Sequence, residues 1–243
     1  MSDGDHDMRA VFDDFKIIDD RLQTRWPGLI PLKQGSTIIA MEASLIRAID
    51  IVLSIALLIT LTPLLLLIGL AVKAENPGPI FFTHRRVGRF GQEFGCLKFR
   101  SMVADADARL QDILAQDVEM HLEWKVDRKL RRDPRVTRVG AFLRRSSLDE
   151  LPQIINVLRG EMSLVGPRPI VSGEVEMYGR YFVHYCSVRP GITGLWQISG
   201  RNDVDYRRRV ALDVLYTRTR SLRLYLLIMA RTPLCVLVAR GSY

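Results

Sequence analysis

The densest group of residues that could do chemistry lies over residues 143–153, in the order Leu-Arg-Arg-Ser-Ser-Leu-Asp-Glu-Leu-Pro-Gln. Asp149 and Glu150 are adjacent carboxylates that open a predicted helix over residues 149–159, with Ser147 and Glu150 spaced as in a capping box. Acidic side chains at a helix start have an ordinary explanation, because the helix dipole stabilises them. Carboxylates can also attack a phosphoryl group or bind a metal ion. The spacing alone leaves these interpretations open.

A second group of candidate residues follows over residues 160–169, where Arg168 stands between two prolines. Because proline restricts both itself and the residue before it, Arg168 is expected in an extended backbone with little freedom, which suits a phosphate clamp. Lys98 and Arg100 form a third basic cluster, and residues 84–86 form a fourth. Arginines near paired carboxylates indicate a magnesium-assisted reaction on phosphates.

Composition and charge limit the partners of such a site. The chain has 243 residues, of which 48% are hydrophobic and 26% are charged, and this mixture fits one folded domain with a strongly apolar segment. Residues 1–50 hold six basic and nine acidic side chains, which gives a charge of −3, and residues 51–72 hold no charged side chain. Because the net charge of the chain is +8, residues 73–243 carry +11. An anionic membrane, a phosphorylated substrate and nucleic acid all suit this charge, which does not separate them.

The strongest single signal is the uncharged run over residues 51–72, which is long enough to cross a bilayer. Pro63 lies near its centre, removes one backbone donor and bends a helix. The hydroxyls of Thr60 and Thr62 could satisfy the carbonyls that this bend frees. Two half-helices could enter the membrane and return to the same face, whereas the acidic front and basic rear favour a simple crossing. The residues alone leave both topologies open.

The remaining elements are predicted from composition and turn signals. Residues 1–42 are polar and broken by prolines, which predicts a poorly ordered extension that is no signal peptide. A short strand is expected at residues 80–83 and a helix over residues 103–125. Residues 206–238 are rich in arginine and leucine and predict helices with a break at Pro233. Such helices suit either an anionic lipid surface or a solvated face.

Taken in order, these features resemble the monotopic phosphoglycosyl transferases, also called bacterial sugar transferases. The likeness is strongest to the hexose-1-phosphate transferases that start exopolysaccharide chains, and it extends from residue 46 to residue 243. The residues that carry it are Asp50, Pro63, Asn156 and the segments 98–102, 147–153, 163–169 and 189–197.

The resemblance implies a reaction and a set of site residues. Asp149 would attack the β-phosphorus of a UDP-hexose, release UMP and hold the phosphosugar covalently until undecaprenyl phosphate takes it. Glu150 would assist, and Mg²⁺ would bind beside Asp149. The phosphate-binding residues that it implies are Arg144, Arg168, Lys98 and Arg100. Galactose or glucose is the expected sugar.

The resemblance also implies an α+β, mainly helical fold in a monotopic membrane protein. The polar extension 1–42 would precede a re-entrant membrane helix over residues 43–74, broken at Thr62 and Pro63 so that both ends stay cytoplasmic. A compact cytoplasmic catalytic domain with amphipathic interfacial helices would cover residues 75–243, at the cytoplasmic face of the inner membrane. The expected partners are UDP-hexose, undecaprenyl phosphate and membrane lipid, without nucleic acid, and a homo-oligomer is left open.

A non-catalytic protein is the competing interpretation. A membrane-tethered scaffold could bind anionic lipid or nucleic acid through the basic residues 73–243. This alternative explains the charge and the apolar segment. It does not explain the adjacent carboxylates or the Gly-Pro-Arg-Pro sequence around Arg168.

Overall fold

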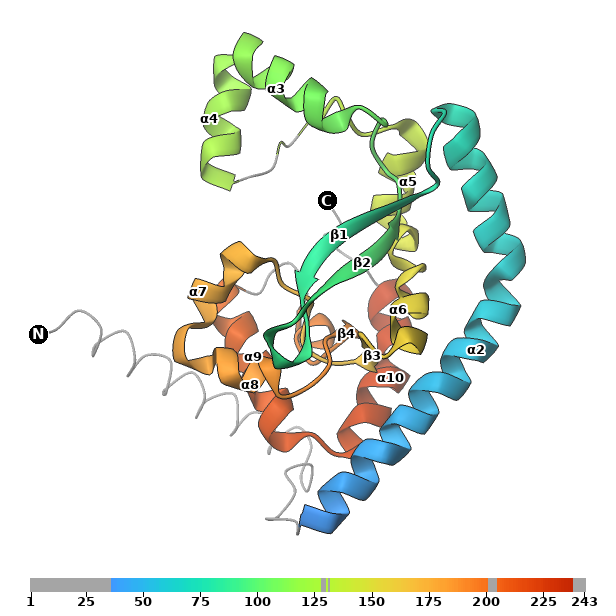
Figure 1. Ribbon diagram of the computed structural model, residues 1–243, viewed down its shortest axis with the longest axis vertical. Helices are drawn as coiled ribbons and strands as arrows, with labels where there is room; N and C mark the ends of the chain where they lie inside the picture. The colour runs from blue at the N-terminus through green and yellow to red at the C-terminus, as the bar shows by residue number, and fades with distance from the viewer. Residues whose placement is uncertain (1–35, 128–129, 131, 201–204, 238–243) are drawn as a thin grey trace, which may run out of the picture. The chain divides into compact units, whose positions relative to one another are not determined.

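The computed structural model describes residues 36–127, 130, 132–200 and 205–237, and this part of the chain is mostly helical, with short strands (Figure 1). The α-helices are α2 (Ser36–Glu75), α3 (Ala106–Gln116), α4 (Val118–Asp127), α5 (Arg138–Ser146), α6 (Gln153–Arg159), α7 (Val175–Tyr178), α8 (Phe182–Cys186), α9 (Tyr206–Thr219) and α10 (Leu222–Leu237). The strands are β1 (Phe81–Val87), β2 (Glu93–Phe99), β3 (Ser163–Val165) and β4 (Gly191–Thr193). Short 3₁₀ turns are η1 (Arg89–Gly91), η2 (Leu148–Glu150), η3 (Ser172–Glu174), η4 (Gly179–Tyr181) and η5 (Gln197–Ser199). The predicted mainly helical α+β class is confirmed.

Within the described residues, α2 is the one helix long and apolar enough to cross a membrane. Only 11% of its apolar window is buried, and large side chains such as Ile59 and Leu66 are exposed along it. Apolar surface of this extent is unfavourable in water and favourable in lipid. The helix therefore fits a monotopic membrane protein.

The predicted interruption of this helix at Thr62 and Pro63 does not appear as a change of secondary structure. α2 is a 40-residue helix with Pro63 in its interior, because a proline removes only one backbone donor and a helix can continue across it. The helix also begins at Ser36, ahead of the boundary expected at residue 43. The re-entrant course stays a prediction, and the predictions for residues 1–35 lie outside the described residues.

Two small sheets accompany the helices. β1 and β2 form a two-stranded hairpin, which confirms the strand predicted at residues 80–83 and extends it to Val87. β3 and β4 pair in parallel, with Ser163 opposite Gly191. Each sheet has only two strands, so the cores are built largely by helices.

The described chain forms two compact units. The first comprises the described parts of residues 1–59, 85–96 and 153–241, and the second comprises those of residues 60–84 and 97–152. α2 and both strands of the hairpin contribute residues to each unit.

The first unit packs around α9 and α10. Residues 210–216 of α9 are all buried. Ala211, Leu212, Leu215 and Tyr216 form a core with Tyr225 and Ile228 of α10, with β3 and with the end of α6. The middle of α9 is therefore buried in the core. It differs from the lipid-bound or solvated face that was expected for residues 206–238. The helical break predicted at Pro233 is wrong, because α10 continues through Pro233. The chain turns at Ser221 instead, whose Oγ accepts a hydrogen bond from a backbone N–H of α10.

Asp50 ties α2 to the rest of the first unit. Its side chain is buried, with a residue exposure of 2%. Asp50 Oδ1 accepts hydrogen bonds from Leu164 N at 2.8 Å, Ser163 Oγ at 3.1 Å and Tyr225 Oη at 2.8 Å. A buried carboxylate needs such donors, and these three join α2 to β3 and α10.

The second unit packs the last turns of α2 against β2 and α5. Ile68 and Val72 of α2 meet Phe99 and Leu143 in a buried cluster. The single helix predicted over residues 103–125 is two helices, α3 and α4. Asp117 between them has an extended backbone, and its Oδ1 accepts a hydrogen bond from Met120 N at 2.9 Å, which begins the second helix.

Candidate active site

Asp149 lies in the 3₁₀ turn η2 between α5 and α6, and not in the continuous helix predicted over residues 149–159. Ser147 has a left-handed backbone, with φ of 57°, and ends α5, so its side chain makes no capping hydrogen bond. The predicted capping box between Ser147 and Glu150 is therefore wrong. α6 begins directly after Pro152, a residue suited to the start of a helix because it lacks a backbone donor.

Hydrophobic side chains hold this turn in place. Leu148 and Leu151 pack on the core cluster that contains Phe99 and Leu143. Asp149 between them is buried, with a residue exposure of 8%. The two leucines thus fix the backbone on either side of Asp149, which restricts where its carboxylate can point.

Lys98 joins the two carboxylates. Its Nζ lies 2.6 Å from Glu150 Oε1 and 3.7 Å from Asp149 Oδ2. Neighbouring residues of a strand point to opposite faces, so Phe99 enters the core of the second unit while Lys98 faces the acids. A single ammonium therefore contacts both acidic side chains and offsets part of their mutual repulsion.

Burial sets the electrostatics of Asp149. Loss of solvent raises the pKa of the Asp149 carboxyl above its usual value, the Lys98 charge lowers it, the Glu150 charge raises it and the Arg144 charge lowers it. The net direction is upward because burial is the largest effect. A buried carboxyl with charged partners on both sides is typical of functional sites.

Arg144 is the second cation associated with Asp149. Its Nε donates a hydrogen bond of 2.8 Å to Ser101 Oγ, and its charge acts on the pKa of Asp149. The structure thus brings together four of the predicted site residues, Lys98, Arg144, Asp149 and Glu150. Their arrangement pairs two acids with two cations, which can hold a phosphate beside a carboxylate.

Arg100 has a structural environment. It is buried, and its guanidinium donates hydrogen bonds to the backbone carbonyls of Asn76 and Pro77, the latter at 3.3 Å. These bonds hold the segment that joins α2 to β1. These contacts indicate a structural role for Arg100, and its phosphate-binding role stays a prediction.

Arg168 belongs to the first unit, whereas the other predicted site residues belong to the second. The backbone before it is tightly placed, because an added Cβ at Gly166 would meet backbone atoms of Arg189 and Gly191. Its guanidinium lies over the ring of Trp196, 5.8 Å from the centroid. The role of Arg168 as a phosphate clamp stays a prediction.

Glu75 is a positioning residue that sequence reasoning missed. Its carboxylate accepts hydrogen bonds from the first backbone N–H groups of α5, Arg138 N at 2.7 Å and Val139 N at 3.0 Å. It thereby fastens the end of α2 to the start of the helix that carries Arg144. Nothing in the sequence indicates this contact, because 63 residues separate Glu75 from Arg138.

Glu75→Ala is expected to destabilise the protein by about 1 kcal/mol, the usual cost of removing a helix cap. The apparent unfolding temperature should fall by about 2–4 °C in differential scanning calorimetry. Glu75→Gln should keep part of the stability, since its carbonyl oxygen still accepts one bond. Equal unfolding temperatures for Glu75→Ala and the unaltered protein would show that the cap contributes nothing.

A family model described as bacterial sugar transferase matches residues 41–239 of the chain. The match covers α2 from residue 41 onward, the hairpin and the turn that holds Asp149. The chain therefore belongs to the bacterial sugar transferase family, and the resemblance inferred from the motifs is confirmed.

Individual relatives agree with this assignment. The chain is similar to the exopolysaccharide production protein ExoY of Sinorhizobium fredii, with 50% identity over 197 residues, or 81% of this chain and 87% of that protein. It is similar to the undecaprenyl-phosphate galactose phosphotransferase of Salmonella typhimurium, with 49% identity over 81% of this chain and 41% of that protein. The UDP-glucose:undecaprenyl-phosphate glucose-1-phosphate transferase of Caulobacter vibrioides is 40% identical over 81% of this chain and 71% of that protein.

Proposed function

We propose that this protein transfers a hexose-1-phosphate from a UDP-hexose to undecaprenyl phosphate and releases UMP, as the first membrane step of exopolysaccharide or related glycan assembly. The observation that carries the proposal is the pair of carboxylates joined by Lys98, 3.7 Å from Asp149 and 2.6 Å from Glu150, in a bacterial sugar transferase. The names of the Salmonella and Caulobacter relatives support the sugar phosphate and the lipid acceptor.

In the first step, an Asp149 carboxylate oxygen attacks the β-phosphorus of the UDP-hexose. The bond between that phosphorus and the bridging oxygen breaks, and UMP leaves with the bridging oxygen and its electron pair. Asp149 then carries the hexose phosphate as an acyl phosphate. Its burial supports this role, because a fixed carboxylate needs little reorganisation before the attack.

In the second step, an oxygen of undecaprenyl phosphate attacks the same phosphorus. The bond to Asp149 breaks, the carboxylate is regenerated, and the product is an undecaprenyl diphosphate hexose. Lys98 and Arg144 oppose the negative charge that gathers around the phosphorus in both steps. Glu150 holds Lys98 in position through the 2.6 Å contact.

Mg²⁺ fits this site as an ion with few protein ligands. The described residues contain no group of three or more histidine, cysteine or acidic side chains placed to hold a metal ion. Mg²⁺ often uses only one or two carboxylates, completed by water and substrate phosphates. Asp149 would hold the ion with Glu150 beside it, and the bound ion would neutralise charge on the diphosphate.

The same proposal places the protein on a membrane. Undecaprenyl phosphate is a lipid, and the exposed apolar surface of α2 supports residence where that lipid lies. We infer the cytoplasmic face of the inner membrane, because UDP-sugars are cytoplasmic metabolites. A re-entrant α2 would keep both of its ends on that face.

UMP release tests the proposal directly. Membranes that contain the protein should release UMP from UDP-galactose or UDP-glucose when undecaprenyl phosphate is present, and EDTA should stop the release until Mg²⁺ is restored. Membranes with Asp149→Asn serve as the control for other enzymes. No UMP from either donor, or from a wider panel of UDP-hexoses, would favour the non-catalytic scaffold.

A further inference from the structure

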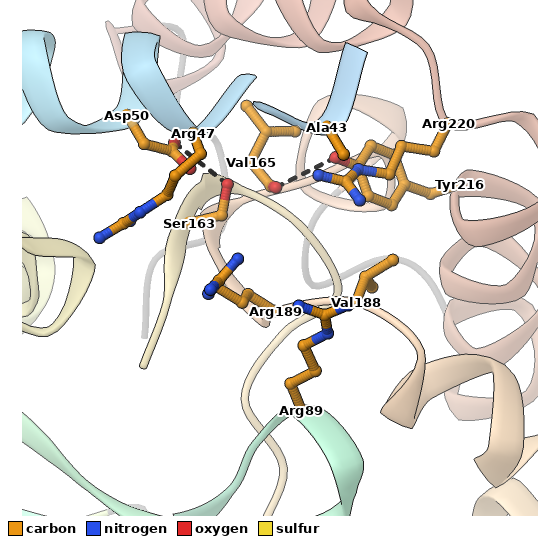
Figure 2. A pocket seen from close by; sticks show the side chains of 10 residues that line it. All are labelled: Ala43, Arg47, Asp50, Arg89, Ser163, Val165, Val188, Arg189, Tyr216 and Arg220. Atoms are coloured by element: carbon orange, nitrogen blue, oxygen red, sulfur yellow. Dashed lines mark hydrogen bonds between the residues drawn. The ribbon is translucent and has the colours of Figure 1, made fainter. Parts of the chain in front are cut away.

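A pocket in the first unit is lined by four arginines from different segments of the chain (Figure 2). Arg47 comes from α2, Arg89 from η1, Arg189 from the segment before β4, and Arg220 from the residue after α9. None of them belongs to the unit that holds Lys98 and the two site carboxylates. The pocket is therefore a second basic site with its own residues.

Backbone carbonyls hold two of these arginines in place. Arg47 donates to Val157 O at 2.8 Å and to Leu158 O at 3.2 Å, which satisfies carbonyls at the end of α6. The Nε of Arg189 donates to Gly160 O at 2.7 Å, just beyond the same helix end. Side chains fixed in this way lose little conformational freedom when they bind a ligand.

Positive charge in the pocket is poorly balanced. Asp50 is the one acidic residue in the lining, and its Oδ1 already accepts three hydrogen bonds. Burial lowers the pKa of the Arg189 guanidinium, and the charges of Arg47, Arg89 and Arg220 lower it further, whereas Asp50 opposes them. The four arginines line one pocket with a single carboxylate, so their positive charges repel one another, and an anion would relieve that repulsion.

Arg89 stacks on the ring of Phe90, 4.4 Å from its centroid, and still has hydrogen-bonding capacity to offer a ligand. Its Nε is buried and has no hydrogen-bond partner among the described residues. A buried guanidinium N–H without a partner is costly, and a bound water, ion or ligand atom would satisfy it. Arg89 is also the lining arginine whose replacement removes no hydrogen bond that the described residues provide.

We propose that this pocket binds a phosphate group, separately from the Asp149 site. Guanidinium groups match phosphate oxygens because their planar forks donate two parallel hydrogen bonds. The pocket adjoins apolar surface of α2, because Asp50 directly precedes exposed Ile51 and Val52, and exposed Leu45 lies two residues before Arg47. The phosphate therefore comes either from a lipid headgroup or from a free phosphate ion.

Thermal unfolding of the full chain in detergent tests this site. The probes are inorganic phosphate and dihexanoyl phosphatidylglycerol, each compared with sodium chloride at equal ionic strength. Each probe is titrated against the unaltered protein, Arg89→Gln, Arg89→Gln/Arg220→Gln and Arg85→Gln. Arg85→Gln is the matched control, because it removes one positive charge from a side chain that is 87% exposed and outside the pocket.

At least one probe should raise the unfolding temperature of the unaltered protein and of Arg85→Gln beyond the effect of sodium chloride. In Arg89→Gln, the concentration that gives half of the rise should increase about tenfold, as expected for the loss of one charge-assisted contact. A lower half-effect concentration for the lipid would identify a headgroup, and a lower one for inorganic phosphate would identify a free phosphate.

Two results would overturn the proposal. One is that neither probe stabilises the unaltered protein more than sodium chloride does. The other is that Arg89→Gln and the double variant respond with the same half-effect concentrations as Arg85→Gln. Each variant is compared with its own unfolding temperature without probe, so a change in basal stability does not affect the outcome.

Discussion

Asp149→Asn is expected to lower UMP release by at least about 10³-fold, because an amide of the same shape cannot form the acyl phosphate. The variant should remain folded. Burial raises the pKa of Asp149 in the folded protein, so its ionisation above that pKa opposes folding, and an uncharged side chain removes this cost. The unfolding temperature at pH 7.5 should therefore equal or exceed that of the unaltered protein.

The matched control for this prediction is Asp112→Asn. Asp112 lies exposed on α3 in the same unit, so its replacement removes one carboxylate without touching the site. UMP release should be unchanged in this control. Near-normal activity of Asp149→Asn would exclude Asp149 as the nucleophile.

Lys98→Gln is expected to have the second large effect on UMP release. The Lys98 charge lowers the pKa of Asp149, so its removal should raise that pKa further. More of Asp149 would then be protonated at a given pH, and the acid limb of the kcat/KM profile should move to higher pH. Near neutral pH we expect a loss of roughly 10- to 100-fold, which reflects two carboxylates left without their shared cation.

The measurement is kcat/KM for UMP release from pH 5.5 to 9, with Lys125→Gln as the control. Lys125 is an exposed lysine on α4 of the same unit, and its replacement should leave the profile in place. Activity of Lys98→Gln should recover in part toward alkaline pH, where Asp149 ionises without help. A profile with an unshifted acid limb would contradict the contact between Lys98 and Asp149.

The acidic part of the site was predictable because its members are adjacent in the sequence. Asp149 and Glu150 also belong to a motif shared with a known family, and the family match agrees with that resemblance. Lys98 was assigned to the phosphate-binding group, but its contact with Glu150 spans 52 residues and no local pattern predicts it. Only the packing of β2 beside the turn makes the three residues neighbours.

The contacts of Arg100 could not be predicted from the sequence. It stands two residues after Lys98, so a continued strand would place both on one face. β2 ends at Phe99, and Arg100 turns to the carbonyls of Asn76 and Pro77 instead. Where the strand ends depends on contacts with a distant segment, which hydropathy and charge do not reveal.

The apolar run of the membrane helix was predictable, but the start of the helix and its continuity were not. An uncharged apolar run identifies itself by composition, and α2 covers all of it. Its start at Ser36 and its continuity across Pro63 depend on local hydrogen bonds that residue types do not determine. The middle of α9 is buried despite its neighbouring arginines because the chain folds α10 and β3 around it.

The proposed covalent intermediate on Asp149 can be detected directly by peptide mass spectrometry. The purified protein would be mixed with UDP-galactose or UDP-glucose and Mg²⁺ without undecaprenyl phosphate, then quenched and digested. We expect one added hexose phosphate on the peptide that contains Asp149, and its disappearance when undecaprenyl phosphate is supplied. UMP release that requires undecaprenyl phosphate from the first turnover, with no adduct on this peptide, would contradict it.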